Sequence, residues 1–79
     1  MFEPNKITRE VRGQSVTLRE LTGEEFTSIE EDADMATIIA LSWDPANVVT
    51  AQQVRSWPFS VQKDLYDICV ELNGLNQGN

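Results

Sequence analysis

The chain has 79 residues, of which 41% are hydrophobic, and a formal net charge of −7 from thirteen acidic and six basic residues. This length supports one small domain, and the hydrophobic content excludes an intrinsically disordered acidic tail. The sequence contains no histidine, the commonest general base and transition-metal ligand, which argues against hydrolytic triads and zinc sites.

The charge is distributed unevenly along the chain. Residues 1–19 carry four basic and two acidic side chains, a net of +2, whereas residues 20–79 carry two basic and eleven acidic side chains, a net of −9. A body of that sign repels phosphate, so we expect no nucleic-acid partner unless the chain imitates nucleic acid itself.

Several sequence features bear on the compartment. Cys69, the single cysteine, has no partner for an internal disulfide, and no apolar run approaches the ~18 residues of a membrane span. The first residues lack the basic and apolar pattern of a secretory signal. We therefore expect a cytoplasmic protein that has no contact with a membrane.

Polar and apolar residues interleave over residues 7–21, a pattern that predicts a β-hairpin. Glycine at the first central position suits a type II′ turn, which places Gly13 and Gln14 at the centre. Such a turn gives the cross-strand pairs Val11–Val16 and Arg9–Leu18. Because a two-stranded ribbon is marginal in water, we expect this one to lie against the helices that follow.

Thr22 and Glu25 form a capping box that predicts the start of the first helix. Its apolar stripe comprises Phe26, Ile29 and Ala33, and the acidic run 30–34 is predicted to be helical and solvent-exposed. Asp34 is a candidate cap for a second helix that Pro45 ends. The two helices are either separate or one bent rod.

Thr50 and Gln53 repeat the capping-box pattern and predict a short helix that turns Val54 and Trp57 inward. Ser60 is the predicted cap of the last helix, and the Asn73–Gly74 pair is its stop signal. This helix has the clearest amphipathic pattern of the chain, with the apolar positions Val61, Leu65, Ile68, Cys69 and Leu72. We expect it to anchor the core, with the cysteine as a buried structural thiol.

The predicted fold class is α+β, with an N-terminal β-hairpin packed on three or four short α-helices. We expect a single domain over residues 1–79, frayed at 1–5 and 76–79. No catalytic, cofactor-binding or metal-binding residue is predicted. The run 30–34 lacks the spaced ligands of a calcium loop, and the four glycines form no phosphate-cradling cluster. We expect neither an enzyme nor a cofactor.

The large aromatic side chains serve either as core or as docking surface in so short a chain. Tyr66 and Val70 fall off the main stripe of the last helix, and with Trp43 and residues 45–49 they are candidates for an exposed apolar patch. The hypothesis is that Trp43, Tyr66 and Val70 contact a protein client or neighbouring copies of the chain. The acidic residues Glu24, Glu30 and Glu31 then supply solubility and electrostatic steering.

The order of segments resembles the small tail assembly chaperones of long-tailed bacteriophages and prophages. The resemblance covers residues 6–75 and rests on a ribbon ending in VTLRELTGEEF, an acidic helix, and the segments ATIIALSW, VTAQQVRSWPFSVQKDL and VELNGL. It implies a non-enzymatic protein of the bacterial cytoplasm that keeps the long helical tape-measure protein soluble and helps tail-tube subunits assemble around it. It also implies a longer form, made in many members by translational slippage near the end of the frame.

Two other functions stay open at this point. An inhibitor that mimics nucleic acid requires carboxylates on one face at phosphate-like intervals, whereas here they occur mainly as helix caps and in the run 30–34. A small regulatory adaptor of phage origin, such as a toxin–antitoxin component, is compatible with the same composition.

Overall fold

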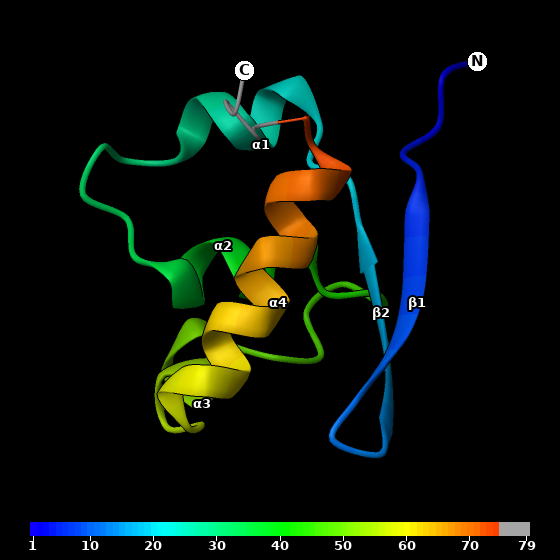
Figure 1. The fold of residues 1–79 in the computed structure, drawn as a ribbon. Coiled ribbons are helices and arrows are strands. Elements are labelled where there is room, and N and C mark those ends of the chain that lie inside the picture. The colour runs from blue at the N-terminus through cyan, green and yellow to red at the C-terminus, as the bar shows by residue number, and fades with distance from the viewer. Residues whose placement is uncertain (75–79) are drawn as a thin grey trace.

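The computed structural model describes residues 1–74. An antiparallel β-hairpin is followed by four α-helices, so the predicted α+β class is confirmed (Figure 1). The elements are β1 (Lys6–Val11), β2 (Gln14–Arg19), α1 (Gly23–Ser28), α2 (Met35–Ser42), α3 (Ala51–Arg55) and α4 (Phe59–Leu72). Residues 1–4 are exposed, and Asn5 exchanges two hydrogen bonds with Glu20. The segment 76–79, expected to fray, lies outside the described residues.

The last helix is the centre of the fold. α4 contacts both strands of the hairpin as well as α2 and α3 (Figure 1). Its residues Leu65, Ile68 and Cys69 are buried, as their spacing predicts, and they meet a core completed by Val16, Leu18, Ala36, Ile39 and Val54. Burying each of the larger apolar side chains contributes about 1.5–3 kcal/mol before conformational entropy is subtracted. The hairpin therefore gains from α4 the buried surface that it lacks alone.

The hairpin turns one position earlier than predicted. Arg12 and Gly13 form the loop with φ angles of 52° and 81°, and two positive values in succession define a type I′ turn. The predicted pairs Val11–Val16 and Arg9–Leu18 are wrong, because Arg9 lies opposite Val16 and Ile7 opposite Leu18. The observed register sets an apolar side chain, not an arginine, across from the deeply buried Leu18.

The free edge of β2 is covered by the residues that follow α2. Trp43 forms an isolated antiparallel bridge with Leu18, and the Asp44 N–H donates to the Thr17 carbonyl at 3.1 Å. This contact satisfies backbone N–H and C=O groups at the edge of β2 that could otherwise form hydrogen bonds with a strand of another chain. It also fixes Trp43 against the sheet.

The first two helices are separate, and the acidic run 30–34 is not helical, contrary to the sequence prediction. α1 ends at Ser28, and Ile29 is already extended with a ψ of 130°. Two effects end α1 before the acidic run. Carboxylates at a helix C-terminus interact unfavourably with the helix dipole. In addition, Asp34 must have an extended backbone to cap α2, where its Oδ1 accepts a hydrogen bond from the Thr37 N–H at 3.1 Å. No residue of α1 is buried, and Phe26 of its predicted apolar stripe is 50% exposed.

Most of the predicted helix ends are confirmed. Both capping boxes, at Thr22 and Thr50, form with their two reciprocal hydrogen bonds, and α4 stops before Gly74 with its φ of 67°. Ser60 is not the cap of α4, because Pro58 occupies that position without a side-chain bond. The ring of Pro58 sets the φ angle for entry into the helix, and the Ser60 hydroxyl is free to accept from elsewhere.

Replacing Arg12 by asparagine tests the turn assignment. Asparagine adopts positive φ at lower cost than arginine and is the preferred first residue of a type I′ loop. We expect Arg12→Asn to raise the free energy of unfolding by about 0.5–1 kcal/mol in urea titrations. A loss of stability of that size would contradict the assigned turn.

Replacing Ser42 by alanine tests the one polar side chain in the core. Ser42 is fully buried, and its Oγ makes no well-formed hydrogen bond within residues 1–74, because its contact with the Cys69 thiol is only a weak one. Because an unsatisfied buried hydroxyl costs about 1–3 kcal/mol, we expect Ser42→Ala to stabilise the fold by about 1 kcal/mol. Destabilisation on urea unfolding would show that the hydroxyl does have a partner.

Candidate functional site

The described residues contain no cluster of side chains placed to bind a metal ion. Residues 1–74 hold no group of three or more His, Cys, Asp or Glu side chains placed to bind an ion, and no described helix is long and apolar enough to cross a membrane. The Cys69 thiol is buried, and burial raises its pKa, an effect that contact with the Ser42 hydroxyl only partly offsets. A thiol of this kind is a poor nucleophile, as the sequence predicts.

The candidate site is an apolar groove, here called the tryptophan groove. Its walls come from the hairpin turn, the residue after α2, the connection between α3 and α4, and the first turns of α4. Its volume is about 310 Å³. It is lined by Val11, Arg12, Gln14, Val16, Trp43, Trp57, Pro58, Val61 and Leu65. Both tryptophans of the chain are in this lining.

The two indole rings form one wall of the groove. The centroids of Trp43 and Trp57 lie 5.5 Å apart with an interplanar angle of 58°, a tilted arrangement within the favourable range for aromatic pairs. Trp43 is held by its bridge to β2. Two independent parts of the chain thus converge on this wall.

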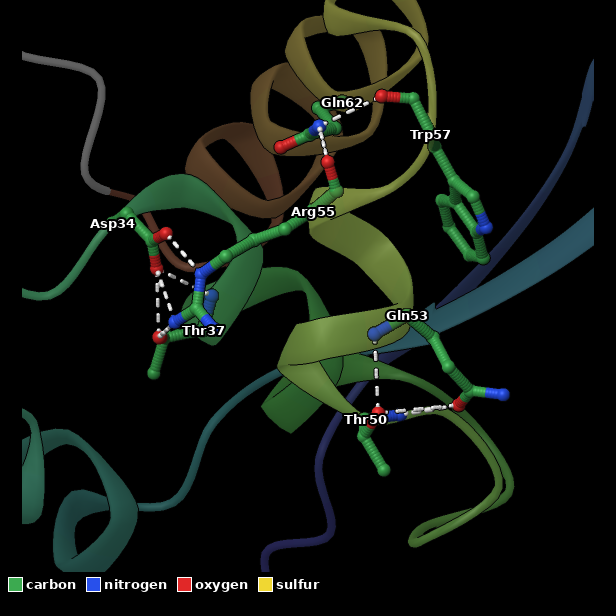
Figure 2. Close-up of polar contacts among 7 residues, drawn as sticks. All are labelled: Asp34, Thr37, Thr50, Gln53, Arg55, Trp57 and Gln62. Carbon is green, nitrogen blue, oxygen red and sulfur yellow. Dashed lines mark hydrogen bonds and ion pairs between the residues drawn. The ribbon is translucent and has the colours of Figure 1, made fainter.

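A side-chain amide fixes the connection that carries Trp57. Gln62 of α4 donates through Nε2 to the Trp57 carbonyl at 2.9 Å and to the Arg55 carbonyl at 3.3 Å (Figure 2). The Arg55 side chain runs to the start of α2, where its Nε donates to Asp34 Oδ2 at 2.7 Å. Figure 2 shows the Trp57 ring extending away from this ion pair. The backbone below the groove is therefore held from α2 and from α4.

Nearly every basic side chain in residues 1–74 has an acidic partner within that part of the chain. The pairs are Lys6–Asp44, Arg9–Glu71, Arg19–Glu25, Arg55–Asp34 and Lys63–Asp67. Most are exposed and contribute little to stability. The exposed carboxyl of Asp34 nevertheless has its pKa held below the usual range, first by hydrogen bonds from Arg55 and Thr37.

Arg12 is the exception among the six basic residues. No carboxylate of residues 1–74 lies within 4.0 Å of its guanidinium, although the chain has thirteen acidic residues. Its Nη2 donates instead to Ser60 Oγ at 2.6 Å. Arg12 is also the one charged residue in the lining of the tryptophan groove. The groove thus combines apolar walls with a single positive charge.

The least exposed ion pair within residues 1–74 joins the end of β2 to α1. Arg19 donates from Nη1 and Nη2 to the two carboxylate oxygens of Glu25, at 2.9 and 2.7 Å, and the two side chains are 15% and 28% exposed. The hydrogen bonds from Arg19 are the main reason that the pKa of Glu25 falls to about 2. Since α1 has no buried residue, this pair and the bond from the Leu21 N–H to Asn73 Oδ1, 2.8 Å long, hold α1 in place.

Of the residues predicted to bind a partner, Trp43 alone lines the tryptophan groove. Trp43 lines the tryptophan groove, whereas the half-buried Tyr66 and Val70 of α4 are outside its lining. Tyr66 packs against the core. The predicted steering residues Glu24, Glu30 and Glu31 are exposed in and after α1. α1 lies by the C-terminal end of α4, whereas the groove borders the start of that helix (Figure 1).

Sequence reasoning missed two residues of the groove. Trp57 was expected inside the core, but it is only half-buried and faces the groove. Arg12 was counted only as part of the basic N-terminal segment. A local signal for it exists, because an arginine directly before Gly13 is unfavourable in a two-residue hairpin loop.

No protein-family model matches this chain, and neither a curated protein nor a solved structure matches it.

The depressed pKa of Glu25 predicts a pH dependence of stability. A carboxyl whose pKa falls from 4.5 to about 2 on folding stabilises the native state above pH 4.5, and this contribution disappears as the pH falls from 4.5 to about 2. We expect a loss on the order of 2 kcal/mol in the free energy of unfolding over that interval. Urea titrations at several pH values measure it.

Glu25→Gln provides the matched variant, because glutamine keeps the capping box but removes the charge. It should be less stable at neutral pH and show a flatter pH dependence than the unmodified chain. Glu24→Gln, an exposed neighbour in the same helical turn, is the control and should keep the wild-type pH dependence. Parallel pH curves for the wild type and Glu25→Gln would contradict the assignment to the Arg19–Glu25 pair.

Proposed function

We propose that this chain is a tail assembly chaperone of a long-tailed bacteriophage or prophage. In this proposal it has no enzymatic activity and acts in the cytoplasm of the bacterial host, where it binds the long helical tape-measure protein and aids assembly of the tail tube. The observation that supports protein binding most directly is the tryptophan groove, an open apolar hollow on a strongly acidic chain. The resemblance of residues 6–75 to this family supplies the identity of the client.

Other exposed apolar side chains support the same proposal. Phe59, next to Pro58 of the groove, is 67% exposed, and Val48 is 57% exposed. Large apolar side chains in contact with water are suited to covering those of another polypeptide. The net charge of −7 then keeps the coated complexes apart, because like charges discourage association.

The two alternative functions have less support. A nucleic-acid mimic needs free carboxylates along one face, but five of the acidic side chains are in ion pairs with the chain's own basic residues. A regulatory adaptor is compatible with the groove, but no further observation favours it. Neither a nucleic-acid mimic nor a regulatory adaptor is expected to keep an aggregating client soluble, whereas a chaperone is.

Co-expression with the tape-measure protein encoded by the same phage tests the proposal. We expect the client to move from the insoluble to the soluble fraction, by several-fold, and to co-purify with this chain on size-exclusion chromatography. The physical reason is the burial of client apolar surface in the complex. A client that stays insoluble at equal expression of both proteins would contradict the proposal.

Two valine variants show which surface carries the binding. Val61→Ser alters the groove, and Val70→Ser alters a position on the same helix that is equally half-buried but outside the groove. We expect Val61→Ser to reduce the soluble client more than Val70→Ser, with melting temperatures used to correct for lost stability. The reverse order would favour the Tyr66 and Val70 surface that the sequence predicts.

A further inference from the structure

The charge at the tryptophan groove restricts what the groove accepts. Arg12 is the one charged residue of its lining, so the charge nearest the groove favours an anionic group over a cationic one. The other five basic residues already have carboxylate partners among residues 1–74. The chain has thirteen acidic residues, yet no carboxylate of residues 1–74 forms an ion pair with Arg12.

The backbone at Arg12 is also exceptional. Its φ of 52° lies in the left-handed region, which asparagine and glycine adopt far more readily than arginine. Residues held in such conformations cluster at functional sites, where their side chains are needed at a particular place. The turn therefore places the Arg12 guanidinium at the edge of the groove although this backbone conformation is unfavourable for arginine.

The side chain of Arg12 still has donors available for a ligand. Within residues 1–74, the guanidinium of Arg12 makes one hydrogen bond, from Nη2 to Ser60 Oγ at 2.6 Å. A guanidinium has five N–H donors in a planar fork that matches a carboxylate in two-point contact. The bond to Ser60 orients this fork across the groove, from the hairpin turn to the start of α4.

The size of the groove favours side chains over a whole helix as its contents. A volume of about 310 Å³ is at the lower end of the ~300–1,000 Å³ typical of small-ligand pockets. One or two apolar side chains of a partner fill such a space, with the rings of Trp43 and Trp57 as one wall. A neighbouring carboxylate on the same partner then reaches the lip of the groove.

We propose that the tryptophan groove binds one face of a partner helix. An apolar side chain of that helix lies between the walls of the groove, and a carboxylate one helical turn away on the same helix forms an ion pair with Arg12. Residues three or four positions apart share a helix face, so the recognised element is a leucine-type residue with an acidic residue at that spacing. This inference rests on the proposed function, in which the client is a helical polypeptide, and names the client segments that are bound.

Synthetic peptides test the proposal directly. Three alanine-based helical peptides of identical length carry two leucines four positions apart and, one turn further, a glutamate, a glutamine or a lysine. Binding is followed by the emission of Trp43 and Trp57, the only tryptophans in the mixture. We expect the glutamate peptide to bind about tenfold more tightly than the lysine peptide at low salt, and the difference to shrink at high salt.

Charge reversal at the groove supplies the decisive variant. In Arg12→Glu the order of affinities should invert in favour of the lysine peptide. Arg9→Glu is the matched control, since Arg9 has the same charge on the same hairpin but is paired with Glu71 and lies outside the groove lining. It should keep the preference for glutamate. Equal affinity of the wild type for all three peptides, no binding of any peptide, or a preference that survives in Arg12→Glu would overturn the proposal.

Other occupants of the groove would show themselves in the same experiments. Binding of sodium octanoate without binding of the glutamate peptide would mean a small carboxylic acid as the ligand, and would overturn the helix proposal. Self-association that is lost in Arg12→Glu, measured by sedimentation velocity, would assign the groove to a second copy of the chain and would overturn it as well.

The experiments distinguish failure of the helix-binding proposal from failure of the chaperone proposal. If Arg12→Glu still solubilises the tape-measure protein and the peptides are not distinguished, the chaperone proposal stands and the inference fails. If the wild-type chain discriminates between the peptides but leaves the tape-measure protein insoluble, the groove assignment stands for a different helical partner.

Discussion

Burial of the apolar face of α4 is the interaction on which the other features of the molecule depend. Leu65, Ile68 and Cys69 contact a core to which the hairpin contributes Val16 and Leu18. A two-stranded ribbon has too little surface to bury on its own, and so small a chain has few alternatives. The tryptophan groove exists because α4 holds the hairpin turn at a fixed distance from the connection that carries Trp57.

The distribution of charge follows from the same arrangement. Most basic residues lie in the hairpin, and those with a neighbouring carboxylate link the hairpin to α1, α4 or the segment after α2. Arg12 is at the tip of the ribbon, where its neighbours are the start of α4 and the apolar groove. An unfavourable backbone conformation and an unmatched charge therefore occur in one residue, a combination that makes Arg12 a candidate functional position.

Features written in local sequence were predictable, and features made by long-range packing were not. The boxes at Thr22 and Thr50, the buried stripe of α4 and its stop at Gly74 all depend on residues within a few positions of one another. The hairpin register depended on the choice between a type I′ and a type II′ turn, which have similar conformational free energies. The end of α1 depended on whether residues 29–34 continue that helix or become extended so that Asp34 can cap α2. The groove joins the hairpin turn to Trp43, Trp57 and α4, and no local pattern in the sequence indicates that these segments meet.

Native-state hydrogen exchange tests whether the hairpin and α4 open as one unit. If the packing of Leu18 on α4 holds the ribbon, the slowest amides of β2 and of α4 should exchange with the same free energy, equal to that of global unfolding, at every urea concentration. Exchange of the β2 amides through a local opening of lower free energy, while α4 stays protected, would contradict the account. In that case α4 would not hold the hairpin, and the groove between them would not be a stable feature of the native state.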